Sequence, residues 1–397
     1  MAKIIGPGSL NVDVTGYAPH LPVHGETTKG TAIRVSPGGK GNNQMTAAHR
    51  AGSEVYIIGH RGSDMMGQIM ARHYATEGMS EKYVCVDPEV ETAGALIEID
   101  ETDGQNRIIV ALSATEHVDR ARVLAAEADF ADCDAVLTQF ETTVEAVLAS
   151  KELAAKYGKP FILNPAPYVP VPEGLFDGVD LVTPNETEAE QFTGIKVDTV
   201  EDCRLAAKKF FEMGVKKVII TLGVRGAYFT DGREEIFVPA LKVKAVETTG
   251  AGDAFNGGLA TAIAEGFPME TALQFATCTA AISVTRYGSS PSMPYRHEIT
   301  WQIFDEKSNR VANMLLGRGI KKGDKVAILM FNCLEWLPIY FGILKTGAIA
   351  VPFNFRYTAN EISYCADLAE ISVMFFGPEF VDRLNINAEE LAKDRLL

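Results

Sequence analysis

Short apolar runs alternate with segments of helical periodicity along the chain up to about residue 290. The clearest runs are VYIIG at 55–59, AVLTQF at 135–140, PFILN at 160–164 and KKVIITLG at 216–223. Short buried strands that alternate with helices are typical of a mainly parallel sheet with helices on both faces. The pattern therefore predicts an α/β fold with three layers, helix on sheet on helix.

Residues 93–112, AGALIEIDETDGQNRIIVAL, follow a different pattern, because apolar and polar positions alternate on either side of Asp103–Gly104. Alternation with a period of two is typical of a strand with one solvated face, and Asp-Gly is a strong hairpin turn signal. We expect an antiparallel hairpin here that forms a flap over a site.

The helical pattern breaks at 289–296, SSPSMPYR, which holds two prolines and three serines. A new alternation follows from about residue 297: a helical segment, the strand-like KVAILM, a second helix and the strand-like AIAVPF. We therefore predict one domain over 1–296 and a smaller αβ segment over 297–397.

Charge and composition narrow the classes of partner. The formal net charge is −15, which disfavours nucleic acid and anionic membranes and points to small molecules. The six cysteines form no C-x-x-C pair and the seven histidines show no ligand spacing, so a structural zinc site has little support. The N-terminus lacks a signal-peptide pattern, and no run of about 18 apolar residues could cross a membrane. We expect a cytoplasmic protein.

The stretch TTGAGD at 248–253 carries the clearest chemistry. Apolar residues at helical spacing follow it, so this turn leads into a helix N-terminus, where unpaired N–H groups and the helix dipole favour an anion. Glycines let a ligand approach the backbone. We expect Gly250, Ala251 and Gly252 to form an anion hole and Asp253 to take a proton from a hydroxyl. For this motif alone, a turn with a structural aspartate cap is an equal alternative.

Three further segments carry polar groups. In the glycine-rich turn at 36–52, Lys40, Asn42 and Asn43 suit a polyhydroxylated ligand, although a flexible loop is the alternative. In PNETEAE at 184–190, Asn185 taken alone is better explained as a helix cap. ITLGVRGAYF at 220–229 is compatible with a turn beside a nucleotide. The chain has no G-x-x-x-x-G-K-[ST] motif, which excludes a P-loop enzyme.

In this order, the motifs closely resemble the ribokinase-like (PfkB) family of sugar kinases. The matching segments are GGKGNNQ near residue 40, NPAP at 164–167, TPNETEAE at 183–190, TLGVRG at 221–226 and TTGAGDAFNGG at 248–258. NPAP and TPNETEAE look most like the ribokinases of the family. The resemblance covers roughly residues 3–296 and implies a three-layer αβα domain with a small β-lid, built from strands near 13–35 and 93–112. It also implies transfer of the γ-phosphoryl group of ATP to a primary hydroxyl of a sugar.

The resemblance implies roles by position. The base would be Asp253, with Gly250, Ala251 and Gly252 as the anion hole. Contacts to the sugar would come from Asn11, Asp13, Gly39, Lys40, Gly41, Asn42, Asn43, Glu141 and Asp253. Contacts to ATP would come from Asn185, Thr221, Gly223, Arg225, Gly226, Gly252 and Thr277.

The resemblance also implies metal ions and a partner. Glu188 would help to organise Mg²⁺. A monovalent cation, K⁺, would be held by groups of Glu247, Thr249, Ser283, Arg286, Gly288 and Ser292. The lid often pairs two subunits in this family, so we expect a homodimer.

Two departures from the family pattern limit these expectations. The family usually has Gly-Ala-Asn after the second lid strand, where this chain has Ser113-Ala114-Thr115-Glu116. Ribose or a similar sugar is therefore the expected substrate, with fructose, a deoxysugar or a nucleoside as alternatives. Position 247 is usually aspartate, and the longer Glu247 would either bind K⁺ with looser geometry or overreach it. A silent sugar- or nucleotide-binding protein is disfavoured because Asp253 and its glycines are intact.

Residues 300–358 resemble the opening of an acyl-CoA synthetase or related adenylate-forming enzyme. The phosphate loop and acceptor-lid domain of such an enzyme are missing, so we expect no adenylation chemistry. The simplest interpretation is a truncated segment that packs as a small αβ appendage, and a role in oligomerisation is the alternative.

Overall fold

The computed structural model describes residues 1–102, 106–331, 333 and 335–384. The chain forms two compact units, Met1–Ile299 and Thr300–Leu397. The expected turn at Asp103–Gly104 lies outside the described residues, because residues 103–105 are not among them.

The first unit is built on a nine-stranded sheet in the order β13-β12-β11-β10-β9-β8-β1-β4-β5. Neighbouring strands are parallel from β11 to β5, and β12 and β13 add an antiparallel edge. The bounds are β1 (Lys3–Pro7), β4 (Glu54–Gly62), β5 (Val84–Asp87), β8 (Ala135–Gln139), β9 (Phe161–Asn164), β10 (Leu181–Val182), β11 (Val218–Thr221), β12 (Gly226–Thr230) and β13 (Glu235–Pro239). Strands β8 and β9 are buried throughout, which explains why they read as continuous apolar runs.

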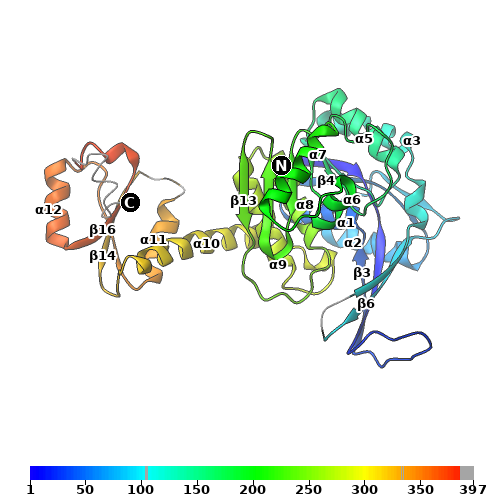
Figure 1. The fold of residues 1–397 in the computed structure, drawn as a ribbon, viewed down its shortest axis with the longest axis horizontal. Helices are drawn as coiled ribbons and strands as arrows, with labels where there is room; N and C mark the ends of the chain where they lie inside the picture. Colours follow the sequence, from blue (N-terminus) through cyan, green and yellow to red (C-terminus); the bar gives the residue numbers. More distant parts are fainter. Residues whose placement is uncertain (103–105, 332, 334, 385–397) are drawn as a thin grey trace. The chain divides into compact units, whose positions relative to one another are not determined.

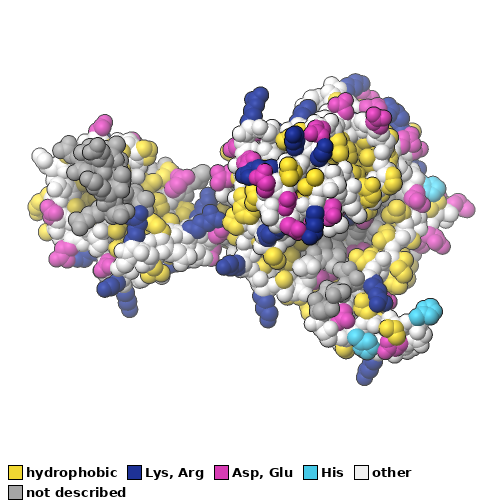
Figure 2. All heavy atoms as spheres, viewed as in Figure 1, with side chains coloured by type: hydrophobic (Ala, Val, Ile, Leu, Met, Phe, Trp, Pro, Cys, Tyr) yellow, Lys and Arg dark blue, Asp and Glu magenta, His cyan; other side chains and the backbone are white. Residues whose placement is uncertain are grey.

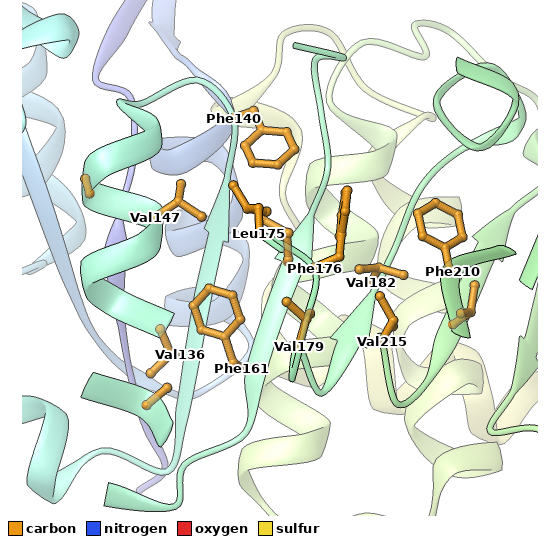
Figure 3. Close-up of a cluster of buried hydrophobic side chains, with 14 of the residues drawn as sticks. Val136, Phe140, Val147, Phe161, Leu175, Phe176, Val179, Val182, Phe210 and Val215 are labelled. Atoms are coloured by element: carbon orange, nitrogen blue, oxygen red, sulfur yellow. The ribbon is translucent and has the colours of Figure 1, made fainter. Parts of the chain in front are cut away.

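Helices cover both faces of this sheet, so the predicted three-layer α/β fold is confirmed (Figure 1). One layer is formed by α1 (Lys40–Arg50), α8 (Ala251–Ala264) and α9 (Met269–Ser283), which pack on one another. The opposite layer holds α3 (Arg120–Ala125), α4 (Glu127–Asp132), α5 (Val144–Tyr157), α6 (Glu186–Thr193) and α7 (Val200–Glu212). Between that layer and the sheet lies the largest core, in which Val147 of α5, Phe161 of β9 and Phe210 of α7 are buried (Figure 3).

A second, four-stranded sheet has the order β3-β2-β6-β7, and we call it the lid sheet. It consists of β2 (Asn11–Ala18), β3 (Ala32–Gly38), β6 (Ala93–Asp100) and β7 (Asn106–Ala111), and its strands run outward from the body of the unit (Figure 1). Strands β6 and β7 pair antiparallel over the residues where the alternation predicts a hairpin. Helix α2 (Met65–Glu77) lies against β2 and β3.

The second unit contains a three-stranded parallel sheet in the order β15-β14-β16. Its elements are α10 (Arg296–Gly317), β14 (Lys325–Leu329), α11 (Trp336–Lys345), β15 (Ile349–Pro352), α12 (Ala359–Ala369) and β16 (Ile371–Phe376). Strand β14 is buried on both faces, between one core around Ile343 and another around Phe380. The order helix, strand, helix, strand agrees with the sequence pattern. Among the described residues, no helix is long and apolar enough to span a membrane.

Candidate active site

The glycine turn at 250–252 begins helix α8, as its sequence predicts. Gly250 is the N-cap and adopts the left-handed conformation, with φ +82°, which glycine adopts without strain. A β-carbon here would lie 3.2 Å from the Cα of Ser289, so the turn also packs closely on its neighbour. Gly252, in contrast, is exposed, and a β-carbon there would meet no atom within 4 Å. The helix N-terminus therefore presents open space beside backbone N–H groups, which suits a phosphate.

Asp253 lies in the first turn of α8 and is 5% exposed. Two side-chain amides from α1 hold its carboxylate: Asn43 Nδ2 donates to Oδ2 at 3.0 Å, and Gln44 Nε2 donates to Oδ1 at 3.0 Å. These bonds fix the plane of the carboxylate, and each oxygen keeps a lone pair for a further donor. Asp253 is thus oriented and still able to accept a proton.

A buried hydrogen-bond network continues from Gln44 back to the glycine turn at 250–252. Gln44 Nε2 also donates to Asn164 Oδ1 at 3.0 Å, and Asn164 Nδ2 donates to the carbonyl of Thr183 at 3.0 Å. Thr183 Oγ1 donates to Asn256 Oδ1 at 2.6 Å, and Asn256 Nδ2 donates to the carbonyl of Gly252 at 2.8 Å. Sequence reasoning missed these four side chains as site residues, although the motifs GGKGNNQ, NPAP, TPNETEAE and TTGAGDAFNGG each contain one of them.

Acidic and amide groups gather on the sugar side expected from the sequence. Glu141, just after β8, accepts hydrogen bonds at its Oε2 from Ser9 Oγ at 2.8 Å and from the backbone N–H of Lys40 at 2.9 Å. Asn11 is buried, and its Oδ1 has no hydrogen-bond partner among the described residues. A buried unpaired acceptor is costly, so Asn11 favours a bound donor.

Asp13 projects from lid strand β2 and is also buried. The pKa of Asp13 is raised to about 6, chiefly by burial and also by the carboxylates of Glu141 and Asp253, against the hydrogen bond from Ser289 Oγ at 2.9 Å, which lowers it. Its carboxylate is therefore held in an unfavourable setting, which a hydroxyl donor from a ligand would relieve.

Lys40 lies among three carboxylates. Burial acts to lower the pKa of Lys40, but Asp253, Glu141 and Glu188 together outweigh burial and raise it. Its ammonium group therefore stays charged, close to the Asp253 carboxylate and at the head of α1. Burial raises the pKa of Glu188, against the effect of Lys40. This pair provides a cation for phosphate and a carboxylate that suits Mg²⁺, which binds through one or two carboxylates together with phosphates and water.

On the expected nucleotide side, Asn185 and Glu188 form a capping box at the start of α6. Asn185 Oδ1 accepts from the N–H of Glu188 at 2.8 Å, and Glu188 Oε2 accepts from the N–H of Asn185 at 2.9 Å. The capping interpretation of Asn185 is therefore correct, and one oxygen of Glu188 is already engaged. The backbone of Asn185 also forms an isolated parallel β-bridge with Thr221, at the end of β11.

The remaining nucleotide-side positions are more dispersed. Arg225 points to the loop after α6, where it binds the carbonyls of Val197, at 3.1 Å, and of Asp198, and contacts Glu186 at 3.2 Å. Gly223 begins a short exposed 3₁₀ turn and Gly226 begins β12. Thr277 is buried on α9, and its hydroxyl has no partner among the described residues.

Of the six residues expected around K⁺, the structure brings Glu247 and Gly288 together. Glu247 Oε2 accepts from the N–H of Gly288 at 3.2 Å and from Tyr17 OH at 2.8 Å. Thr249 lines the same cavity of about 430 Å³ as Glu247. The other three side chains bond elsewhere: Ser283 to Ala280 O, Ser292 to Ser289 O and Arg286 to Glu298. Within the described ranges, no cluster of three or more His, Cys, Asp or Glu residues could hold a metal.

Two family models match parts of this chain. Residues 1–296 match the family model for pfkB family carbohydrate kinases, and residues 278–396 match the model for AMP-binding enzymes. A ribokinase of Haemophilus influenzae is 36% identical over 291 residues, which cover 73% of this chain and 95% of that protein. A deoxyribokinase of Salmonella typhi is 33% identical over 288 residues, which cover 72% of this chain and 94% of that protein.

Solved structures extend the likeness to three dimensions. The structure of Arabidopsis thaliana ribokinase complexed with ribose and ATP superimposes with a TM-score of 0.69 at 30% identity. The match covers 76% of this chain and 98% of that protein. The AMP-binding match agrees with the resemblance seen in the last hundred residues. From the match over residues 1–296 and these relatives, the chain belongs to the pfkB family and is an ATP-dependent carbohydrate kinase.

Proposed function

We propose that this kinase transfers the γ-phosphoryl group of ATP to the primary hydroxyl of ribose or a closely similar sugar, with Asp253 as general base. The observation that carries the proposal is the setting of Asp253, which is buried, held by two amides and adjacent to an open helix N-terminus. A hydroxyl oriented toward this carboxylate loses its proton as it attacks, which typically contributes about 10²- to 10⁴-fold.

The other residues act on charge and position. The N–H groups of Gly250, Ala251 and Gly252 stabilise the charge that develops on the transferred group, and the Lys40 ammonium adds a positive charge. Asn11, Asp13 and Glu141, with the Gly39–Asn43 turn, bind and orient the sugar. Asn185, Thr221, Gly223, Gly226 and Thr277 line the nucleotide side, while Arg225 supports the loop after α6.

Two ions belong to this proposal. Glu188 would hold Mg²⁺ with the phosphates, and this ion would neutralise phosphate charge. A monovalent cation would be held by groups near Glu247, Thr249, Gly288 and Ser292, and its charge would steady the anion-hole turn. Backbone bonds from Val246 and Glu247 to the carbonyl of Val284, at 2.7 and 3.2 Å, support this placement because they tie the two segments together.

A deoxysugar is the second candidate substrate. The segment Ser113–Glu116, which replaces the family's Gly-Ala-Asn, lies just after β7, and Ser113 has φ +39°, a conformation that favours glycine. The deoxyribokinase of Salmonella typhi, at 33% identity against 36% for the Haemophilus influenzae ribokinase, acts by its name on a different sugar.

A panel assay tests the substrate. ADP release should be measured with ribose, 2-deoxyribose, fructose and a nucleoside, each over a range of concentrations. We expect ribose to give the highest kcat/KM. A higher value for deoxyribose would favour the second candidate, and binding of sugars without ADP release would contradict a catalytic role.

We also propose that two copies pair through the lid sheet. Val35, Leu96 and Ile109 are 54%, 47% and 69% exposed and form one row across the sheet, because Val35 and Leu96 both pair with Val14 and Leu96 pairs with Ile109. Hydrophobic side chains gather along the lid strands in Figure 2. Light scattering should give a dimer mass, and Val35→Glu should give a monomer.

A further inference from the structure

The lid sheet is attached to a three-residue segment, Tyr287–Ser289, by two residues of its strand β2. Ser289 Oγ donates to Asp13 at 2.9 Å. Tyr17 OH donates to Glu247 Oε2 at 2.8 Å, and the N–H of Gly288 donates to the same oxygen at 3.2 Å. Residues four apart along a strand point to the same face. Both attachments therefore come from one face of β2.

Aromatic contacts reinforce the outer attachment. The rings of Tyr17 and Tyr287 meet edge to face, with centroids 6.0 Å apart and planes at 89°. The guanidinium of Arg34, on the neighbouring strand β3, lies 4.4 Å from the ring centroid of Tyr287 and 5.7 Å from that of Tyr17. Tyr17 is only 6% exposed. Its burial and its bond to Glu247 raise its pKa, so the hydroxyl remains a donor at neutral pH.

The same segment packs on the anion-hole turn. Ser289 is the residue whose Cα a β-carbon at Gly250 would approach to 3.2 Å. Glu247 reaches the turn along the chain, because it precedes Gly250 by three residues. The groups that bind Tyr17 and Asp13 are thus the direct neighbours of the turn that receives the phosphoryl group.

We propose that Tyr17 is a positioning residue for the sugar: its hydrogen bond to Glu247 holds lid strand β2 against Tyr287–Ser289 and so keeps Asp13 over the substrate. The proposal rests on the proposed function, in which Asp13 binds the sugar. An aspartate at position 247 would be shorter by one methylene, about 1.5 Å, and would not reach the Tyr17 hydroxyl. The proposal therefore gives the glutamate at this position a role of its own. Loss of the bond weakens the hold on the sugar and leaves the base and the anion hole in place.

Tyr17→Phe tests this because it removes one hydroxyl and keeps the ring against Tyr287 and Arg34. We expect KM for the sugar to rise about 3- to 10-fold, while kcat and KM for ATP stay within twofold. The matched control is Tyr83→Phe, which removes a bond of the same kind, 2.6 Å from a tyrosine hydroxyl to Asp129, in an aromatic cluster with Tyr56. The control should keep the wild-type KM for the sugar.

Glu247→Gln separates the hydrogen bond from the charge, because glutamine keeps an acceptor oxygen for Tyr17. Because Glu247 also belongs to the proposed cation site, both Glu247 variants are expected to lower kcat at limiting K⁺, so KM for the sugar is compared at saturating K⁺. There, Glu247→Gln should raise this KM less than Glu247→Ala does, Glu247→Ala should raise it as much as Tyr17→Phe, and the double variant Tyr17→Phe/Glu247→Ala should raise it no further. An unchanged KM for the sugar in Tyr17→Phe overturns the proposal, as does a fall in kcat alone with a lower Tm, which would indicate a purely structural role. If the wild type phosphorylates no sugar, the proposed function fails instead.

Discussion

Gln44 and Asp253 lie on different helices, and a hydrogen bond of 3.0 Å joins the amide of one to the carboxylate of the other. Both side chains are nearly inaccessible, at 1% and 5% exposure. The same amide nitrogen reaches Asn164 at the end of β9. The orientation of the proposed base therefore depends on α1 and on the sheet as well as on its own helix.

Replacing Gln44 tests this dependence. Gln44→Met keeps the length of the side chain but removes both hydrogen bonds, so the carboxylate of Asp253 can rotate out of its reactive plane. We expect kcat to fall about 10-fold with little change in KM for ATP, which corresponds to about 1.4 kcal/mol in the barrier. Steady-state kinetics should be compared with Gln68→Met, the same substitution at an exposed position of α2. Equal kcat in the two variants would show that Gln44 does not position the base.

The buried carboxylate of Asp13, which is proposed to bind the sugar, should lower the free energy of unfolding at neutral pH. Its folded pKa, about 6, exceeds the ordinary value of 3.8, so the folded protein binds its proton more tightly than the unfolded chain does. Its contribution to stability therefore falls as the pH rises from about 4 through 6, and the penalty is complete above that range. We expect Asp13→Asn to raise the free energy of unfolding at pH 7 by about 1–3 kcal/mol and to weaken sugar binding at least 10-fold.

Denaturant unfolding at pH 5 and pH 7 and sugar titration check this prediction together. The stabilisation by Asp13→Asn should be smaller at pH 5, where Asp13 of the wild type is largely protonated when folded. A variant that is destabilised at pH 7, or that binds sugar as the wild type does, would be inconsistent with it.

Much of this arrangement follows from local sequence patterns. The apolar runs predict β4, β8, β9 and β11, and the glycine turn predicts the N-terminus of α8, because strand burial and helix entry depend on neighbouring residues. The Gln44–Asn164 and Tyr17–Glu247 bonds join residues 120 and 230 positions apart. No local sequence pattern predicts such pairs, because only the tertiary fold brings their residues together.

The orientation of individual side chains was also beyond the sequence. Arg225 lies next to the expected nucleotide turn, yet its guanidinium binds the carbonyls of Val197 and Asp198. A motif predicts which turn a residue lies in. The direction of a long side chain depends on the hydrogen-bond acceptors around it, which the motif does not reveal.

Glu247→Asp should change the response to potassium. The shorter carboxylate loses Tyr17 and is expected to bind the cation with better geometry, so activity should saturate at a lower K⁺ concentration while KM for the sugar rises. Activity should be titrated with K⁺ in a sodium-free buffer for the wild type and the variant. Superimposable titration curves would remove Glu247 from the cation site.

The second unit should be dispensable for the kinase reaction. All proposed site residues lie within Met1–Ile299, and residues 300–397 form a separate compact unit with cores of its own. Deletion of residues 300–397 should leave kcat and both KM values within about twofold. A truncated protein that is soluble and monodisperse but inactive would show that the second unit takes part in activity.

The central claim is that Asp253 is the general base of a sugar kinase, and Asp253→Asn tests it most directly. The amide keeps the shape of the side chain but cannot accept the proton. Single-turnover phosphorylation should be measured with calorimetric binding of ribose and ATP to the same protein. We predict a fall in rate of at least 100-fold with both ligands still bound. A variant that retains more than a tenth of the wild-type rate would contradict the account.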